Sequence, residues 1–186
     1  MSSDPIDPRL DHEPHGAHAL AQHYLKDLIY GANDGIITTF AVVAGVAGAQ
    51  LDPRIVLVLG FANLFADGFS MGASNFLSIR SDEAVRQASG RTVLEPFPFR
   101  HSLATFSAFL VAGIIPLVSY VAAVSAANRF ALAVLLTLTT LFGVGALRSL
   151  VTDVRWWRGG FQMLSVGSIA AAVAYGVGAF VSQLTA

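Results

Sequence analysis

Two acidic side chains in this sequence, Asp34 and Asp67, lie within long apolar stretches. A carboxylate at the centre of a bilayer costs at least about 2.5 kcal/mol unless it is paired or hydrated, so such residues usually mark a path for ions or protons. We therefore predict that both carboxylates bind a cation. The alternative is a helix cap or an interhelical hydrogen bond near the interface. It applies most to Asp34, which lies only about two turns into its apolar stretch.

The residues around Asp67 at helical spacing are polar as well. On a helix with 100° per residue, one narrow sector contains Asn63, Asp67, Ser70, Met71, Ser74 and Ser78. Carboxylate and amide oxygens together with a thioether sulfur suit Fe²⁺ and Mn²⁺ better than Mg²⁺ or Ca²⁺. We predict Asp67, Asn63 and Met71 as metal ligands beside Asp34, although a lone methionine often serves packing alone. Ser70 and Ser74 are expected to line the path, because such hydroxyls usually bond to their own helix backbone.

A face of small residues accompanies the first carboxylate. One side of the first apolar stretch carries Asp34, Thr38, Ala41, Gly45 and Gly48. Small residues let membrane helices approach closely, so we predict that this face meets its copy in a second subunit, with Thr38 lining the path. The glycines expected at helix contacts are Gly31, Gly35, Gly45, Gly68 and Gly72.

The elements that position these residues must be membrane helices. The 186-residue chain has 54% hydrophobic and 12% charged residues and a mean hydropathy of +0.63, an excess that requires contact with lipid. A span needs about 20 helical residues. Apolar runs of suitable length lie at residues 28–49, 55–79, 102–124, 130–146 and 161–181. The predicted fold is all-α, with five transmembrane helices over 28–186 and no soluble domain, after a cytoplasmic tail and an amphipathic interfacial segment over 1–27.

The charges in the loops predict the orientation. Of the 11 Lys and Arg residues, only Arg54 and Arg129 fall on the side opposite the N terminus and the polar connector 80–101. Because positive residues stay in the cytoplasm, we predict a cytoplasmic N terminus and a C terminus outside. The preference for arginine over lysine and the abundance of alanine favour a bacterial cytoplasmic membrane.

Composition narrows the possible partners. The chain has no cysteine, which excludes thiolate metal sites, and its net charge of −1 argues against nucleic acid. The N-terminal tail offers imidazole and carboxylate groups that can collect metal, although most such tails do not. These groups belong to Asp11, His12, Glu13, His15, His18 and His23. Asp82 and Glu83, at the end of the second span, are predicted to form a solvated helix end.

Two longer segments carry a family resemblance. They are residues 30–45, YGANDGIITTFAVVAG, and residues 63–72, NLFADGFSMG. Both resemble the vacuolar iron transporter family, and the likeness extends over all five spans. The resemblance implies a homodimer of five-helix protomers that moves Fe²⁺ or Mn²⁺ out of the cytosol in exchange for protons, with the metal as cargo and no permanently bound cofactor. It also implies that Asp34 and Met71 contact the metal inside the membrane and that Asp67 belongs to the same path.

The sequence departs from this family at two places. Asn63 stands where plant and fungal members have a glutamate, so a charged ligand or proton carrier is missing there, and Asp67 is expected to replace it. The connector 80–101 is short and net basic, whereas those members have a long Glu-rich insert that collects metal. The chain therefore resembles the minimal bacterial or nodulin-like type.

Three other functions stay open at this point. A passive cation channel would use the same residues without proton coupling, and the effect of a pH gradient on flux separates it from a transporter. An intramembrane aspartyl protease also needs two membrane aspartates. The Tyr-Asp and Gly-x-Gly-Asp segments of those enzymes surround neither Asp34 nor Asp67, so we predict that the protein is not an enzyme. A purely structural membrane protein would tolerate alanine at both aspartates.

Overall fold

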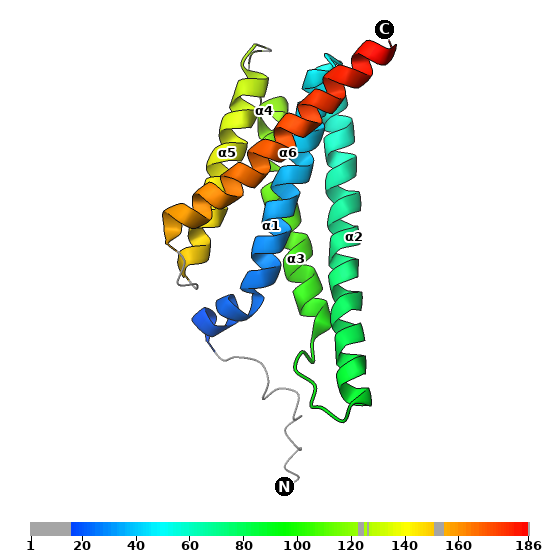
Figure 1. Ribbon diagram of the computed structural model, residues 1–186, viewed down its shortest axis with the longest axis vertical. Helices are drawn as coiled ribbons and strands as arrows, with labels where there is room; N and C mark the ends of the chain where they lie inside the picture. Colours follow the sequence, from blue (N-terminus) through cyan, green and yellow to red (C-terminus); the bar gives the residue numbers. More distant parts are fainter. Residues whose placement is uncertain (1–15, 123–124, 126, 151–154, 186) are drawn as a thin grey trace.

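The computed structural model describes residues 16–122, 125, 127–150 and 155–185, which form helices and turns (Figure 1). The elements are α1 Ala17–Gly48, α2 Pro53–Ala88, α3 Pro98–Gly113, the 3₁₀ turn η2 Ile115–Leu117, α4 Val118–Val121, α5 Arg129–Leu147, the 3₁₀ turn η3 Arg148–Leu150 and α6 Trp156–Thr185. The tail residues Asp11, His12, Glu13 and His15 lie outside the described residues, as does the side chain of His18.

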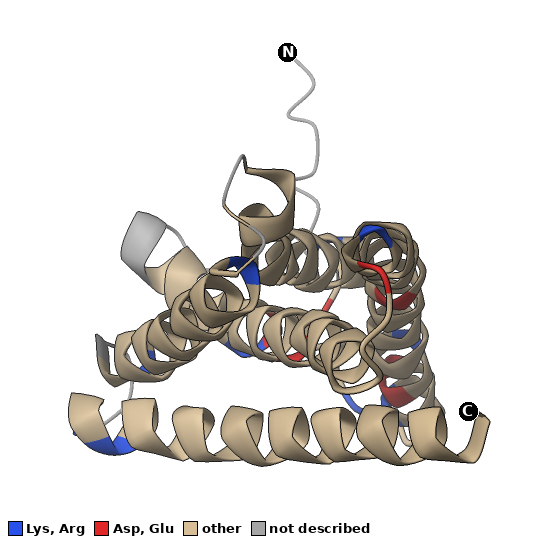
Figure 2. Cartoon of the chain, turned by 90° about the horizontal axis from the view of Figure 1, so that it is seen from above, with Lys and Arg blue, Asp and Glu red and all other residues tan. Residues whose placement is uncertain are grey.

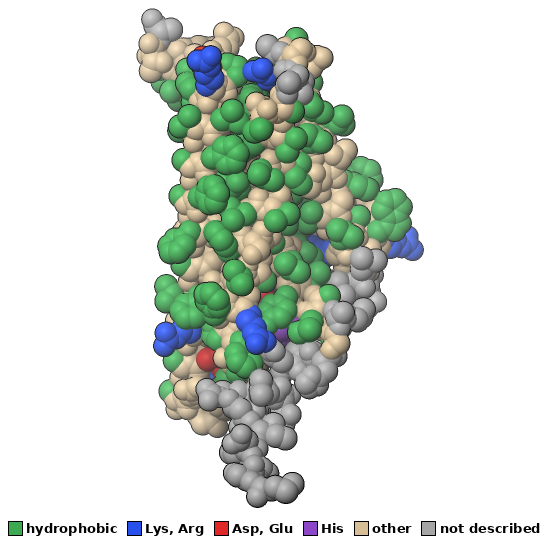
Figure 3. Space-filling view, turned by 180° about the vertical axis from the view of Figure 1, so that it is seen from behind, with side chains coloured by type: hydrophobic (Ala, Val, Ile, Leu, Met, Phe, Trp, Pro, Cys, Tyr) green, Lys and Arg blue, Asp and Glu red, His purple; other side chains and the backbone are tan. Residues whose placement is uncertain are grey.

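The predicted all-α membrane fold is confirmed. Five helical segments are long and apolar enough to cross a membrane, and the third of them combines α3, η2 and α4. Pro116 lies in η2, where its missing N–H interrupts the helix ladder and the chain tightens into a 3₁₀ turn. The start of α1 and the end of α6 lie at opposite ends of the bundle, as an odd number of spans predicts (Figure 1). A broad hydrophobic band separates Lys and Arg side chains near the two ends of the face in Figure 3.

The helices α1 and α2 extend furthest beyond the predicted spans, at the end of the bundle that carries the N terminus. The helix α1 begins at Ala17 rather than near residue 28, and α2 continues through Ala88 rather than ending near residue 79. Residues 80–88 contain no Gly or Pro, so nothing in that stretch breaks the helix. The helix ends before Gly90, whose positive φ of 70° is readily adopted only by glycine. The polar connector is therefore only the segment 89–97.

The helix α1 lies at the centre of the bundle. Its side chains Ile36, Phe40 and Val43 are buried. On one side, Gly31 and Gly35 lie directly against the backbone of α3 at Thr105 and Phe109, where no larger side chain fits. The bundle thus has a tight α1–α3 contact that fixes α1 around Gly31 and Gly35.

The C-terminal part of α1 packs against α6 of the same chain. Gly48 lies against the backbone of Tyr175, and Gly45 lies against the backbone of Gly178. Figure 2 shows α6 as a layer along one side of the other helices. The prediction that Gly45 and Gly48 meet a second subunit is therefore wrong, because α6 of the same chain already covers both glycines. On α2, Gly68 and Gly72 lie against Phe106 of α3.

Candidate metal pathway

The two predicted carboxylates occupy neighbouring helices, α1 and α2. Asp34 and Asp67 are both half-buried, and they lie close enough for their negative charges to repel each other. Thr38 donates its hydroxyl to the backbone oxygen of Asp34 at 2.8 Å, so this side chain bonds to its own helix. Asn63, about one turn from Asp67, is half-buried, and its Nδ2 has no hydrogen-bond partner among the described residues. A pair of like charges in this position favours a cation or protons between them.

A cavity of about 460 Å³ lies on the N-terminal side of this pair, between α1 and α2. Its lining consists of Lys26, Asp27, Tyr30, Met71, Ser74, Asn75 and Ser78. Met71 is about one turn of α2 from Asp67, and Asp27 is about two turns of α1 from Asp34. The structure thus brings the predicted Met71 and Ser74 together with Asp27 and places them between that end of the bundle and the carboxylate pair.

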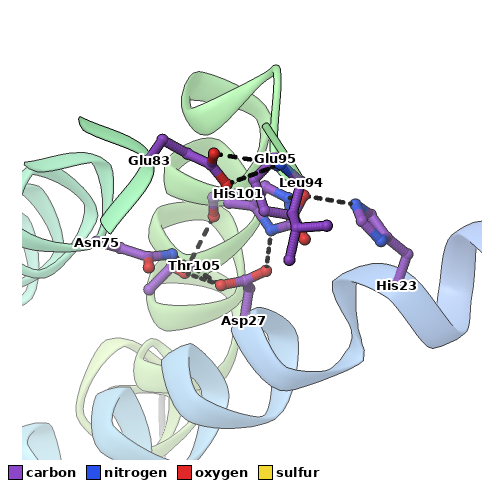
Figure 4. Close-up of polar contacts among 8 residues, drawn as sticks. All are labelled: His23, Asp27, Asn75, Glu83, Leu94, Glu95, His101 and Thr105. Atoms are coloured by element: carbon purple, nitrogen blue, oxygen red, sulfur yellow. Dashed lines mark hydrogen bonds and ion pairs between the residues drawn. The ribbon is translucent and has the colours of Figure 1, made fainter. Parts of the chain in front are cut away.

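A buried polar network ties three helices together beside this cavity (Figure 4). Asn75 of α2 donates to Asp27 Oδ1 of α1 at 2.7 Å, and its Nδ2 lies 2.8 Å from Thr105 Oγ1 of α3. The other oxygen of Asp27 lies 2.6 Å from Nδ1 of His101 in α3. Asp27 and His101 are 7% and 6% exposed, so this is an interior network rather than a surface ion pair.

The connector between α2 and α3 is held by Glu83. The carboxylate of Glu83 accepts hydrogen bonds from the backbone N–H of Leu94 at 3.1 Å and of Glu95 at 2.9 Å. Glu83 is only 8% exposed. The prediction that Glu83 belongs to a solvated helix end is therefore wrong, whereas Asp82 is exposed as predicted. The bonds fix the backbone of the connector and with it the position of the Glu95 side chain.

Sequence reasoning missed Asp27, Asn75, Glu83 and His101. Asp27 lies seven residues before Asp34, which places both on one face of a helix, and this spacing was the available signal. The polar and charged residues before residue 28 favour an interfacial segment, and this pattern hides the buried position of Asp27. His101 was placed in the connector, whereas it lies in the first turn of α3, which begins at Pro98.

The polar face of α2 is largely uncovered in the single chain. Ser70 and Ser74 are exposed, and they lie in the middle of the second span rather than at its end. Hydroxyl groups facing lipid are unfavourable compared with hydroxyl groups facing another helix or a water-filled path. This face and the carboxylate pair define a polytopic membrane protein with a polar seam along α1 and α2.

The chain belongs to the VIT family, because the model of that family matches residues 25–95 and 84–179. The resemblance predicted from residues 30–45 and 63–72 is thereby confirmed. Members of this family are transporters and not enzymes, which confirms that expectation and removes the protease alternative.

Three relatives show how the similarity is distributed. The chain is 48% identical to the vacuolar iron transporter of Plasmodium berghei (strain Anka) over 33% of its own length and 22% of that protein. It is 30% identical to vacuolar iron transporter homolog 4 of Arabidopsis thaliana, covering 61% of the chain and 62% of the relative. It is 26% identical to vacuolar iron transporter 1 of Arabidopsis thaliana, covering 89% of each.

The coverage differs among these relatives. The match spans less than a quarter of the Plasmodium protein and less than two thirds of homolog 4. The alignment with vacuolar iron transporter 1 extends over 223 positions, more than the 186 residues of the chain. That relative therefore contains residues within the matched region that this chain lacks.

Proposed function

We propose that this protein is a divalent transition-metal transporter that moves Fe²⁺ or Mn²⁺ out of the cytosol in exchange for protons. The observation that carries the proposal is the pair of half-buried carboxylates, Asp34 and Asp67, whose charges repel each other within the membrane-spanning helices. The nearby cavity is lined by Met71, about one turn of α2 from Asp67, and this side chain offers a sulfur ligand. The names of the relatives, vacuolar iron transporters, support metal as the cargo.

The carboxylate pair suggests how metal and proton flux are coupled. Two neighbouring carboxylates in a low-dielectric region are neutralised either by one divalent cation or by protons, and the two kinds of neutralisation exclude each other. A site that accepts metal from one side and protons from the other exchanges them. Asn63 contributes an amide oxygen to this site, while Thr38, Ser70 and Ser74 line the path. A passive channel remains the second candidate, because it would use the same residues without this exchange.

The orientation and the division of the chain complete the proposal. Residues 28–186 belong to the membrane domain, and α1 extends this domain toward the N terminus, because it begins at Ala17 within the predicted interfacial segment. The end of the bundle that carries the start of α1 faces the cytoplasm, and the C terminus lies outside, in a bacterial cytoplasmic membrane. The support for this is the excess of Lys and Arg on that side.

Uptake into proteoliposomes tests the function directly. The wild-type protein should take up Fe²⁺ and Mn²⁺ faster than Ca²⁺, and an imposed pH gradient should change the rate. Met71→Leu keeps the volume of the side chain and removes the sulfur, so Fe²⁺ uptake should fall more than Mn²⁺ uptake, because the harder ion depends less on a soft ligand. Uptake rates that do not change with the pH gradient would favour the channel. Uptake of Ca²⁺ as fast as that of Fe²⁺ and Mn²⁺ would argue against a transition-metal site.

The uncovered face of α2 supports a homodimer in which this face meets a second copy. The chain has no cysteine, so Ser74→Cys introduces a single thiol. In membranes, this variant should form a covalent dimer with a short thiol-specific crosslinker. The matched control is Ile169→Cys on α6, which is 65% exposed and should remain monomeric after the same treatment. Crosslinking at residue 169 but not at residue 74 would place the dimer contact on α6 instead.

A further inference from the structure

We propose that His23, Glu95 and His101 form a transition-metal site at the N-terminal end of the bundle, separate from the carboxylate pair. Nε2 of His23 lies 3.2 Å from Oε2 of Glu95, and Nε2 of His101 lies 2.9 Å from the same oxygen (Figure 4). These three potential ligand atoms lie within 4.8 Å of one another. Two imidazole nitrogens and a carboxylate oxygen directed at one point are a ligand set for a divalent transition metal.

The geometry needs little adjustment to hold an ion. Ligand atoms bonded to such a metal at about 2.0–2.2 Å lie roughly 3 to 4 Å apart. The side chains of His23 and Glu95 are 20% and 34% exposed, so both have room to rotate toward a shared ion, whereas His101 is fixed in the interior at 7%. A cavity of about 510 Å³, lined by all three side chains, gives access for the ion and for water ligands.

Asp27 orients the buried imidazole. Its Oδ2 lies 2.6 Å from Nδ1 of His101, which directs Nε2 of the same ring toward Glu95. A carboxylate on the far nitrogen is the common arrangement for metal-binding histidines, because it fixes the tautomer and the orientation of the ring. Asp27 is itself held by Asn75, so the orientation is anchored on α2 as well.

The three ligands come from three parts of the chain, namely α1, the connector and α3. Their approach depends on Glu83, which holds the backbone of residues 94 and 95. The site is therefore assembled by folding rather than by a flexible run of ligands, in contrast to a tail that collects metal through neighbouring histidines. The imidazoles favour Fe²⁺, Co²⁺ and Zn²⁺ over Mg²⁺ and Ca²⁺, which prefer oxygen.

The position of the site suggests its role. The cavity beside it and the cavity lined by Met71 share Lys26, Asp27 and Asn75. A metal released by the imidazoles thus passes Asp27 before it reaches Met71 and the carboxylate pair. This capture role rests on the proposed transport function, whereas metal binding at the site does not.

Cobalt binding tests the site without relying on transport. The full-length protein, free of any purification tag and carrying Asp34→Asn and Asp67→Asn, is titrated with Co²⁺ in detergent, and the visible absorption is recorded. One Co²⁺ per chain should bind, Zn²⁺ should displace it, and excess Mg²⁺ or Ca²⁺ should not. His23→Gln and Glu95→Gln should each weaken binding at least about 10-fold, since even partners of metal ligands contribute 10- to 100-fold.

Matched controls distinguish binding by these three ligands from nonspecific attraction of Co²⁺ to other side chains. His15→Gln removes a tail histidine, and Asp82→Asn removes an exposed acid at the wall of the same cavity. Both should leave Co²⁺ affinity within about twofold of the parent protein. Unchanged binding in His23→Gln and Glu95→Gln, with thermal unfolding like that of the parent, would overturn the proposal, as would equal loss in Asp82→Asn. Failure of this test leaves the dependence of transport on Asp34 untouched, so the two proposals fail separately.

Discussion

Asp34→Asn protein in liposomes is expected to carry no metal flux above that of empty liposomes, at either of two pH gradients. Asparagine keeps the shape and most of the hydrogen bonding of aspartate, but it has no charge to bind a cation and no proton to exchange. Asp67→Asn should have the same effect, because we propose that the two interacting carboxylates bind one ion together. Neither change should disturb folding, since removing one of two repelling charges relieves an unfavourable interaction.

The control for this pair is Asp52→Asn. Asp52 is exposed at the start of α2, where its side chain accepts a hydrogen bond from the N–H of Arg54 at 2.8 Å. Asparagine caps a helix about as well as aspartate, so this variant loses the same charge without losing its structural role. Its flux should match the wild type. Wild-type flux in both Asp34→Asn and Asp67→Asn would show that the carboxylate pair is not the path.

The spans and the carboxylates inside them could be predicted from the sequence, because both depend on local properties. A membrane helix needs about 20 apolar residues, and any charge within it is conspicuous. The same reasoning placed Asp34 and Asp67 on two neighbouring helices, although nothing in the sequence fixed how close their side chains come. The structure adds that their charges interact.

The network around His101 could not be predicted, because it depends on contacts between distant segments. Asp27 and His101 are separated by 74 positions, and Asn75 joins them from a third helix. In sequence, each residue stands at the polar edge of an apolar run, where a solvated position is the simplest expectation. Burial becomes possible only because α1 and α2 extend beyond the apolar core and because Glu83 holds the connector against them.

The small face of α1 shows a second limit of sequence reasoning. Small residues predict that a helix approaches closely, but they do not identify the partner. In this protein, Gly45 and Gly48 meet α6 of the same chain. The polar face of α2 is uncovered in the single chain, and this is the face that we propose a second copy covers.

Gly35→Leu is expected to prevent the protein from folding, whereas the aspartate variants should remain folded. A Cβ atom at this position would collide with the backbone oxygen of Phe109 and lie 3.0 Å from its Cα. Backbone atoms cannot rotate away as the end of a side chain can, so α1 and α3 would have to separate. Phe109 is fully buried, and its packing would be lost when the two helices separate. We expect a destabilisation of more than about 3 kcal/mol, at the upper end of the range for overpacked cores.

The measurement for Gly35→Leu is the yield of monodisperse protein in detergent and its thermal unfolding temperature. The matched control is Gly143→Leu in α5, where an added Cβ meets no atom within 4 Å among the described residues. Both changes remove a helical glycine and add the same apolar side chain, so insertion into the membrane and helix propensity change equally. Only the close approach of α1 to α3 distinguishes them. Normal yield and stability for Gly35→Leu would show that these two helices lie farther apart than described, and the position of Asp27 beside His101 would then lose its support.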